Sequence, residues 1–181
     1  MQNSFFNISK KLLDVSDKAL SLCESEFKKI DNITEYNQQK VLKAFIDNGV
    51  SESHFTSSTG YGYDDRGRDT LDKVFASSFG AEDALVRHNF VSGTHTLTVA
   101  LFGILRPGDT MLCITGLPYD TIRGVIGIGK SSNGSLKEFG INYEQIDLNS
   151  DGTINIDEVK KRVKNGYKMV YIQRSRGYTL R

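Results

Sequence analysis

Apolar residues recur at helical spacing along the first part of the chain, and the pattern predicts two helices. The first runs from Ile8 to Ile30, and the second runs from about Thr34 to Asp47. The second ends near Asn48-Gly49, residue types that commonly close a helix. We therefore expect a helical N-terminal segment, residues 1–55, ahead of a second domain, residues 56–181.

Beyond residue 55, short apolar runs alternate with helical patterns. The runs predict strands at Ala84–Val91, Met111–Thr115, Tyr143–Asp147 and Met169–Gln173. The helical patterns predict Thr70–Phe79 closed by Gly80, Thr96–Leu105, a helix capped by Asp120 or Thr121 that runs to about Ile128, and Ile156–Val163. This alternation predicts an α/β fold with a mostly parallel sheet and right-handed crossovers. Because the last strand would need a neighbour on each side, we expect the sheet to be incomplete.

Composition and charge mainly exclude classes of partner and site. The 181 residues carry a formal net charge of +1, with 38% hydrophobic and 25% charged residues, so electrostatics gives no argument for a nucleic-acid or membrane partner. No apolar run reaches the length of a membrane helix, and Met1–Asp14 lacks the apolar stretch of a secretion signal. Cys23 and Cys113 lack metal-type spacing. We expect a cytoplasmic protein with two buried or free thiols, no metal site and a local ligand site.

The segment Ser92-Gly93-Thr94-His95 joins the expected strand Ala84–Val91 to the expected helix Thr96–Leu105. A helix start leaves backbone N–H groups unpaired, and the helix dipole favours an anion there. A glycine in such a turn also lets a ligand approach the backbone closely. The segment is therefore a candidate phosphate site, of a kind that the sequence pattern alone signals only weakly.

Four further segments flank this turn in a particular order. They are Gly60–Leu71 and Phe79–Val86 upstream, and Leu105–Asp109 and Gly116–Thr121 downstream. In this order the segments resemble the fold-type I pyridoxal-phosphate enzymes of cysteine and methionine metabolism. The closest likeness is to the methionine gamma-lyase-like group often labelled aluminium resistance proteins, and it covers about Phe55 to Arg181.

This resemblance implies a fold, a cofactor and a reaction. The fold would be part of the three-layer sheet domain of pyridoxal-phosphate transferases, so that residues 56–181 form the N-terminal part of the cofactor-binding domain. The cofactor would be pyridoxal 5'-phosphate, the substrate a sulfur-containing amino acid, and the assembly a homo-oligomer. The activity would be that of a carbon–sulfur lyase of the methionine gamma-lyase or cystathionine lyase type.

The resemblance also implies roles for individual residues around the cofactor phosphate. Backbone N–H groups of Gly93 and Thr94 would hold the phosphate, with hydroxyl donors from Ser92 or Thr94. In related lyases a Tyr and an Arg from the neighbouring subunit complete the phosphate cage. Tyr61, Tyr63 and Arg68 are the favoured candidates, with Arg66 also in the same loop, although their spacing departs from the commoner Tyr-x-Arg arrangement.

Two further positions are assigned by resemblance. Tyr119 follows the expected strand Met111–Thr115, at the edge of the sheet where open α/β folds bind ligands. By resemblance its ring would stack on the pyridine ring and assist proton transfer. His95 has two alternatives, which are contact with the cofactor from the first helical turn and a hydrogen bond to nearby backbone.

Two groups that such a lyase needs have no matching position in this sequence. They are the Lys that forms the Schiff base and the acidic residue for the pyridine nitrogen; Lys130 and Lys168 do not fit the place of that Lys. We therefore expect the front half of an enzyme, cut short before the Schiff-base Lys and inactive by itself. The alternative is a non-catalytic remnant or interaction module that binds phosphorylated ligands through Ser92–His95.

A nucleotide-binding loop is a competing interpretation. The stretch Gly124–Ser131 matches the pattern G-x-x-x-x-G-K-[ST], which cradles nucleotide phosphates. Such a loop must directly follow a buried strand, whereas Asp120-Thr121-Ile122-Arg123 precedes Gly124. The context therefore argues against nucleotide binding.

A calcium loop is the other competing interpretation. Asp147–Glu158 carries acids or amides at loop positions one, three and five, Gly at six and Glu at twelve, as in an EF-hand. An EF-hand needs an entering helix, whereas Gly140–Ile146 reads as a strand. A strand, an Asp/Asn/Gly turn and a capped helix explain the same residues and are the favoured interpretation.

Overall fold

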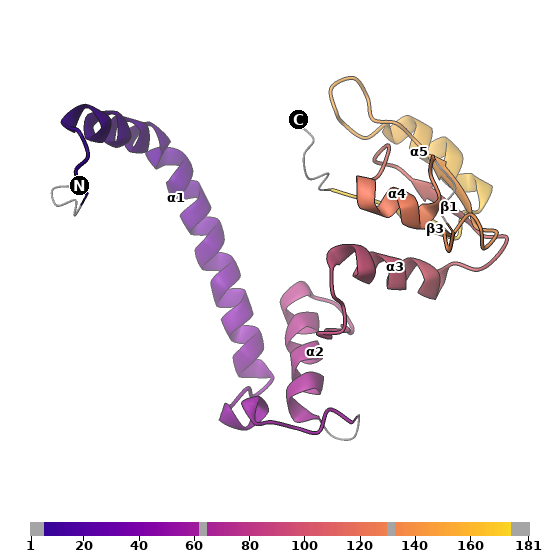
Figure 1. Cartoon of the computed structure of the whole chain (residues 1–181), viewed down its shortest axis with the longest axis horizontal. Coiled ribbons are helices and arrows are strands. Elements are labelled where there is room, and N and C mark those ends of the chain that lie inside the picture. The colour runs from indigo at the N-terminus through magenta and orange to yellow at the C-terminus, as the bar shows by residue number, and fades with distance from the viewer. Residues whose placement is uncertain (1–5, 62–64, 130–132, 175–181) are drawn as a thin grey trace. The chain divides into compact units, whose positions relative to one another are not determined.

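The computed structural model describes residues 6–61, 65–129 and 133–174. The chain divides into two compact units, with the boundary between Arg87 and His88. The first unit contains the helices α1 and α2, and the second contains an α/β sheet (Figure 1). The predicted boundary between residues 55 and 56 lies inside the first unit. The division into residues 1–55 and 56–181 stays a prediction.

A single helix, α1 (Lys10–Asp47), occupies the region for which two helices were predicted. The prediction of a break near residue 31 was wrong, because no Gly or Pro lies within α1 and the polar residues Asp31 and Asn32 cost a helix little. The end was predicted correctly: the N–H of Asn48 donates to Ala44 O, and Gly49 follows with a φ of 62°. Ala44 is the buried residue of α1, and Asn48, just beyond the end of the helix, donates from its side chain to Oγ of Ser77 in α2.

The helix α2 (Arg66–Phe79) confirms the predicted helix and begins one turn earlier than expected. Asp65 caps its start by accepting the N–H of Arg68 at 3.0 Å, and Gly80 ends it with a φ of 64°. The short 3-10 helix η1 (Glu52–Phe55) packs against α2 at Gly67, where an added Cβ would lie 2.5 Å from the carbonyl oxygen of His54. A glycine is therefore required at this close contact.

The second unit is built on a parallel sheet, as predicted. In the described part of the chain its strands are β1 (Thr110–Cys113), β2 (Asn142–Gln145) and β3 (Met169–Tyr171), in the order β2-β1-β3. Thr110 pairs with Asn142, and Met111 pairs with Met169. The central strand β1 is buried on both faces, because helices cover both sides of a parallel sheet.

Helices cover the two faces of this sheet and make three layers. Met111 and Cys113 face one side and pack with residues of α3 (Gly93–Ile104) and α4 (Asp120–Ile126), including Leu101 and Ile122. Leu112 and Ile114 face the other side and pack with Val159 of α5 (Ile156–Arg162), which continues into the 3-10 helix η2 (Val163–Asn165). The alternation along β1 therefore produces the predicted α/β architecture.

The predicted strand Ala84–Val91 is wrong, since the segment forms turns and irregular structure. A strand needs a hydrogen-bonding neighbour, and no strand in residues 6–61, 65–129 or 133–174 pairs with this one. Its backbone is bonded differently: the N–H of Val86 donates to the carboxylate of Asp72, and Leu85 and Val91 remain exposed. The turn at Ser92 therefore follows irregular chain rather than a strand.

Candidate functional site

The start of α3 presents backbone donors, as the sequence predicted. Ser92 is the N-cap, and its Oγ accepts the N–H of His95 at 3.1 Å. Among the described residues, no acceptor is bonded to the N–H groups of Gly93 and Thr94. A Cβ added at Gly93 would meet no atom within 4 Å. Two open donors beside open space, at the positive end of a helix, fit a phosphate group.

The hydroxyl of Thr94 joins this helix start to a second one. Its Oγ1 lies 2.7 Å from Oγ1 of Thr121, in the first turn of α4. The two starts therefore lie side by side, with one hydroxyl proton of the pair left to donate elsewhere. The sequence analysis considered Thr121 only as a helix cap and missed its contact with Thr94. The position of Thr121, two residues after Tyr119, was the only feature of the sequence that pointed to the site.

Tyr119 lies at the carboxyl edge of the sheet, as predicted. Its backbone N–H donates to Oε1 of Gln173 at 2.8 Å, just beyond the end of β3. Gln173 in turn donates its own N–H to Oγ1 of Thr115, which follows β1. The Tyr119 side chain is half-buried. Sequence reasoning placed Gln173 inside a strand and missed its contact; a polar residue ending an apolar strand was the only signal.

The predicted cap of α4 was wrong. Tyr119, rather than Asp120 or Thr121, is the N-cap, and no side chain caps this helix. The Asp120 carboxylate instead accepts the N–H of Thr121 at 2.6 Å. The helix ends at Ile126 because Gly127 adopts a φ of 90°, two residues before the predicted end.

His95 makes the backbone contact that was one of its two predicted roles. Its Nδ1 accepts the N–H of Val91 at 3.4 Å, and its ring lies edge-on to Phe90 with the centroids 6.0 Å apart. These contacts orient the imidazole at the first turn of α3. Contact between His95 and a cofactor stays a prediction.

The remaining predicted residues belong to the first compact unit. Tyr61 is 85% exposed, and Tyr63 lies outside the described residues. The Arg68 side chain donates from Nε to Oδ1 of Asp69 at 3.3 Å, and Arg66 is exposed in the first turn of α2. Their assignment to a phosphate cage stays a prediction.

The nucleotide-loop and calcium-loop matches lie in the structural contexts that argued against both functions. Gly124 lies inside α4, so a helix rather than a strand leads into the nucleotide-loop match, whose Lys130 and Ser131 lie outside the described residues. Asp147–Glu158 follows β2. Hydrogen bonds from the hydroxyl of Thr153, and then from its N–H, lower the pKa of Asp151. Asn155 caps α5 by accepting the N–H of Glu158. The predicted strand, turn and capped helix are confirmed.

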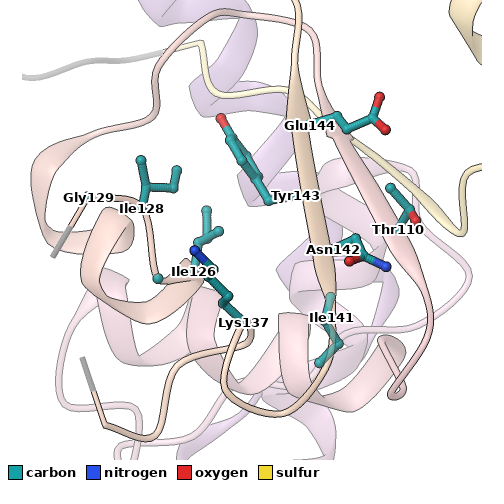
Figure 2. Close-up of a pocket in the computed structure, with 10 residues that line it drawn as sticks. Thr110, Ile126, Ile128, Gly129, Lys137, Ile141, Asn142, Tyr143 and Glu144 are labelled. Carbon is teal, nitrogen blue, oxygen red and sulfur yellow. The ribbon is translucent and has the colours of Figure 1, made fainter. Parts of the chain in front are cut away.

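A pocket of about 560 Å³ lies elsewhere in the second unit. It is lined by Thr110 and Asn142, the first residues of β1 and β2, and by Lys137 and Tyr143. Figure 2 shows the Tyr143 ring directed toward Ile128, while Glu144 points away. Burial, followed by the nearby Cys113, raises the pKa of Tyr143. The strands begin here and end near Tyr119, so this pocket is separate from the candidate phosphate site.

The cysteines and helices of the described ranges indicate neither a metal centre nor a membrane span. Cys23 is exposed and Cys113 is buried, and both are free thiols as predicted. Within the described ranges, no group of three or more His, Cys, Asp or Glu side chains could hold a metal ion. No helix in the described part of the chain is long and apolar enough to cross a membrane.

Comparison with known proteins gives consistent matches. Residues 12–181 match the family described as methionine gamma-lyase. The uncharacterized protein YnbB of Bacillus subtilis (strain 168) is 50% identical over 155 residues, which are 85% of this chain and 37% of YnbB.

Solved structures give the same result. A carbon–sulfur lyase involved in aluminum resistance from Clostridium novyi NT is 53% identical, with a TM-score of 0.87 over 93% of this chain and 41% of its own. A protein from Clostridium acetobutylicum, described as a candidate cystathionine beta-lyase involved in aluminum resistance, is 50% identical, with a TM-score of 0.90 over 98% and 43%. The chain therefore spans less than half the length of these relatives.

Proposed function

Because the chain belongs to the methionine gamma-lyase family, we propose that it is the phosphate-binding part of a pyridoxal-phosphate-dependent carbon–sulfur lyase. The observation that carries the proposal is the start of α3, where the N–H groups of Gly93 and Thr94 have no acceptor among the described residues and a Cβ at Gly93 would meet open space. The descriptions of two relatives, a carbon–sulfur lyase and a candidate cystathionine beta-lyase, support the reaction class.

The donors at α3 suit the cofactor phosphate in number and charge. Gly93 and Thr94 each offer one backbone N–H, and the hydroxyl of Ser92 can donate because its oxygen already accepts from His95. The hydroxyl pair of Thr94 and Thr121 offers one more proton. Bound there, pyridoxal phosphate would supply the electron sink for loss of the α proton and of a sulfur leaving group from an amino acid.

Tyr119 would position the cofactor ring. It lies at the carboxyl edge of the sheet as the N-cap of α4, and Thr121 in the first turn of that helix contacts Thr94. An aromatic ring stacked on a planar ligand contributes roughly 0.5–1.5 kcal/mol beyond its burial and excludes water from that face. The phenolic oxygen of Tyr119 would hold or move a proton there.

We further propose that a neighbouring copy completes the site in a homo-oligomer, with Tyr61, Tyr63 and Arg68 as its contribution. Support comes from α1, a 38-residue helix with large apolar side chains exposed along it, among them Leu22 and Ile30 at 75% and 56% exposed. Exposed apolar surface of this extent commonly marks an interface. Sedimentation that gives a monomer at every concentration would refute this part.

Turnover requires groups that have no match in this chain, the Schiff-base Lys and the acid for the pyridine nitrogen. We therefore propose that the 181-residue chain binds the cofactor and does not release a keto acid from methionine or cystathionine by itself. A keto acid released by the purified chain would contradict this.

The cofactor proposal is tested by calorimetry with pyridoxamine 5'-phosphate, a probe that cannot react with Lys side chains. We expect Gly93→Val to weaken binding at least tenfold, because a branched side chain would occupy the open space at one of the two donor residues. Gly103→Val is the matched control, since Gly103 lies in the same helix and its Cβ also meets open space. Equal binding by both variants would refute the site.

The same titration distinguishes a cofactor site from the alternative, an interaction module that binds phosphorylated ligands. Such a module would bind inorganic phosphate or phosphoserine about as tightly as pyridoxamine 5'-phosphate, because only the phosphate would be recognised. A cofactor site would bind the pyridine compound more tightly, since Tyr119 adds a contact to its ring. Competition between the probes distinguishes the two.

A further inference from the structure

Gln173, two residues beyond the end of β3, is bonded to two distant parts of the unit. Oε1 of Gln173 accepts the N–H of Tyr119, 54 residues earlier, at 2.8 Å. The N–H of Gln173 donates to Oγ1 of Thr115 at 3.1 Å, and Thr115 is only 7% exposed. A chain of hydrogen bonds therefore runs from a buried residue after β1, through Gln173, to Tyr119.

Local hydrogen bonds also hold the start of α4. It is the N-cap of α4, a helix of seven residues that no side chain caps. Its carbonyl accepts the N–H of Ile122 at 3.2 Å, and the preceding carbonyl of Pro118 accepts Nε of Arg123 at 2.7 Å. The bond to Gln173 joins Tyr119 to the segment that follows β3, outside its own helix.

We propose that Gln173 is a positioning residue for Tyr119, which holds the backbone from which the Tyr119 ring extends over the cofactor. The inference rests on the proposed function, because it assigns a role at the same site. The backbone N–H of Tyr119 can only donate, so the oxygen of the Gln173 amide must face it. A carboxylate can replace that oxygen, whereas an alkyl group cannot.

The experiment is a double-mutant cycle read out as affinity for pyridoxamine 5'-phosphate. We expect Gln173→Leu to weaken binding about three- to tenfold, the effect of losing one hydrogen bond. Gln173→Glu keeps the acceptor and should bind within about twofold of the original protein. In a Tyr119→Ala background, Gln173→Leu should cause no further loss, because the ring that it positions is absent.

Three outcomes would overturn the inference. Gln173→Leu could leave affinity unchanged although Tyr119→Ala weakens it, or it could weaken affinity equally in both backgrounds, which would mean that Gln173 does not act through Tyr119. Gln173→Glu could bind as poorly as Gln173→Leu. Failure of the proposed function differs from all three: Gly93→Val would then leave binding unchanged. Thermal unfolding of each variant without ligand verifies that it is folded.

Discussion

Arg87 donates from Nη1 to Oδ1 of Asp72 over 2.7 Å, and the backbone N–H of Val86 donates to the same oxygen at 2.7 Å. The Asp72 side chain is 14% exposed and the Arg87 side chain 26%. The hydrogen bond from Arg87 lowers the pKa of Asp72, with Val86 adding to the effect. This pair attaches the segment after α2 to the helix itself, where a strand had been expected.

Asp72→Ala should destabilise the first unit by about 1–2 kcal/mol, because a partly buried charged acceptor and its bond to Val86 are lost together. Asp69→Ala is the control in the same helix, since the Asp69 side chain is 53% exposed and its pairing with Arg68 contributes less. Urea unfolding followed by circular dichroism measures both. Equal losses would mean that the Asp72 contacts do not stabilise the fold.

The contribution of Asp72 should depend on pH. Its folded pKa lies below the ordinary 3.8, so its stabilisation is present above that value and is lost as the pH falls through the folded pKa. The difference in stability between the original protein and Asp72→Ala should therefore be full at pH 6 and shrink below about pH 4. A difference that stayed constant down to about pH 2 would contradict the assignment.

Gly67→Ala should destabilise the first unit by about 1–3 kcal/mol, because the added Cβ would lie 2.5 Å from the carbonyl oxygen of His54 and force η1 away from α2. Gly103→Ala is the matched change in a helix where the Cβ meets open space, and it should stabilise by about 0.5 kcal/mol. Thermal unfolding compares the two. The same sign for both variants would argue against the close contact at Gly67.

Asn32→Pro tests whether α1 is continuous. Proline inside a helix costs about 3 kcal/mol, so the substitution should lower the helical signal at 222 nm and separate the two halves of α1. Asn32→Ala, which favours helix, should leave the signal equal or higher. If both variants kept the original signal, the chain would contain the two shorter helices that the sequence pattern predicted.

The sequence predicted those parts of the structure that depend on local pattern. Short apolar runs bounded by Gly and Pro predicted β1, β2 and β3, and helical spacing predicted α2 and α3 close to their observed bounds. The turn Ser92–His95 could be found because a helix start carries open donors wherever it occurs. Tyr119 could be placed at the sheet edge because parallel strands end at the same edge.

Only the tertiary structure decided which distant residues meet and which segments become strands. Ala84–Val91 has an apolar pattern and is no strand, because strand formation requires a partner that local sequence does not specify. The order β2-β1-β3, the approach of Thr121 to Thr94 and the bond from Tyr119 to Gln173 join positions far apart in the chain. Such contacts are set by the packing of the whole unit, so residue spacing alone could not predict them.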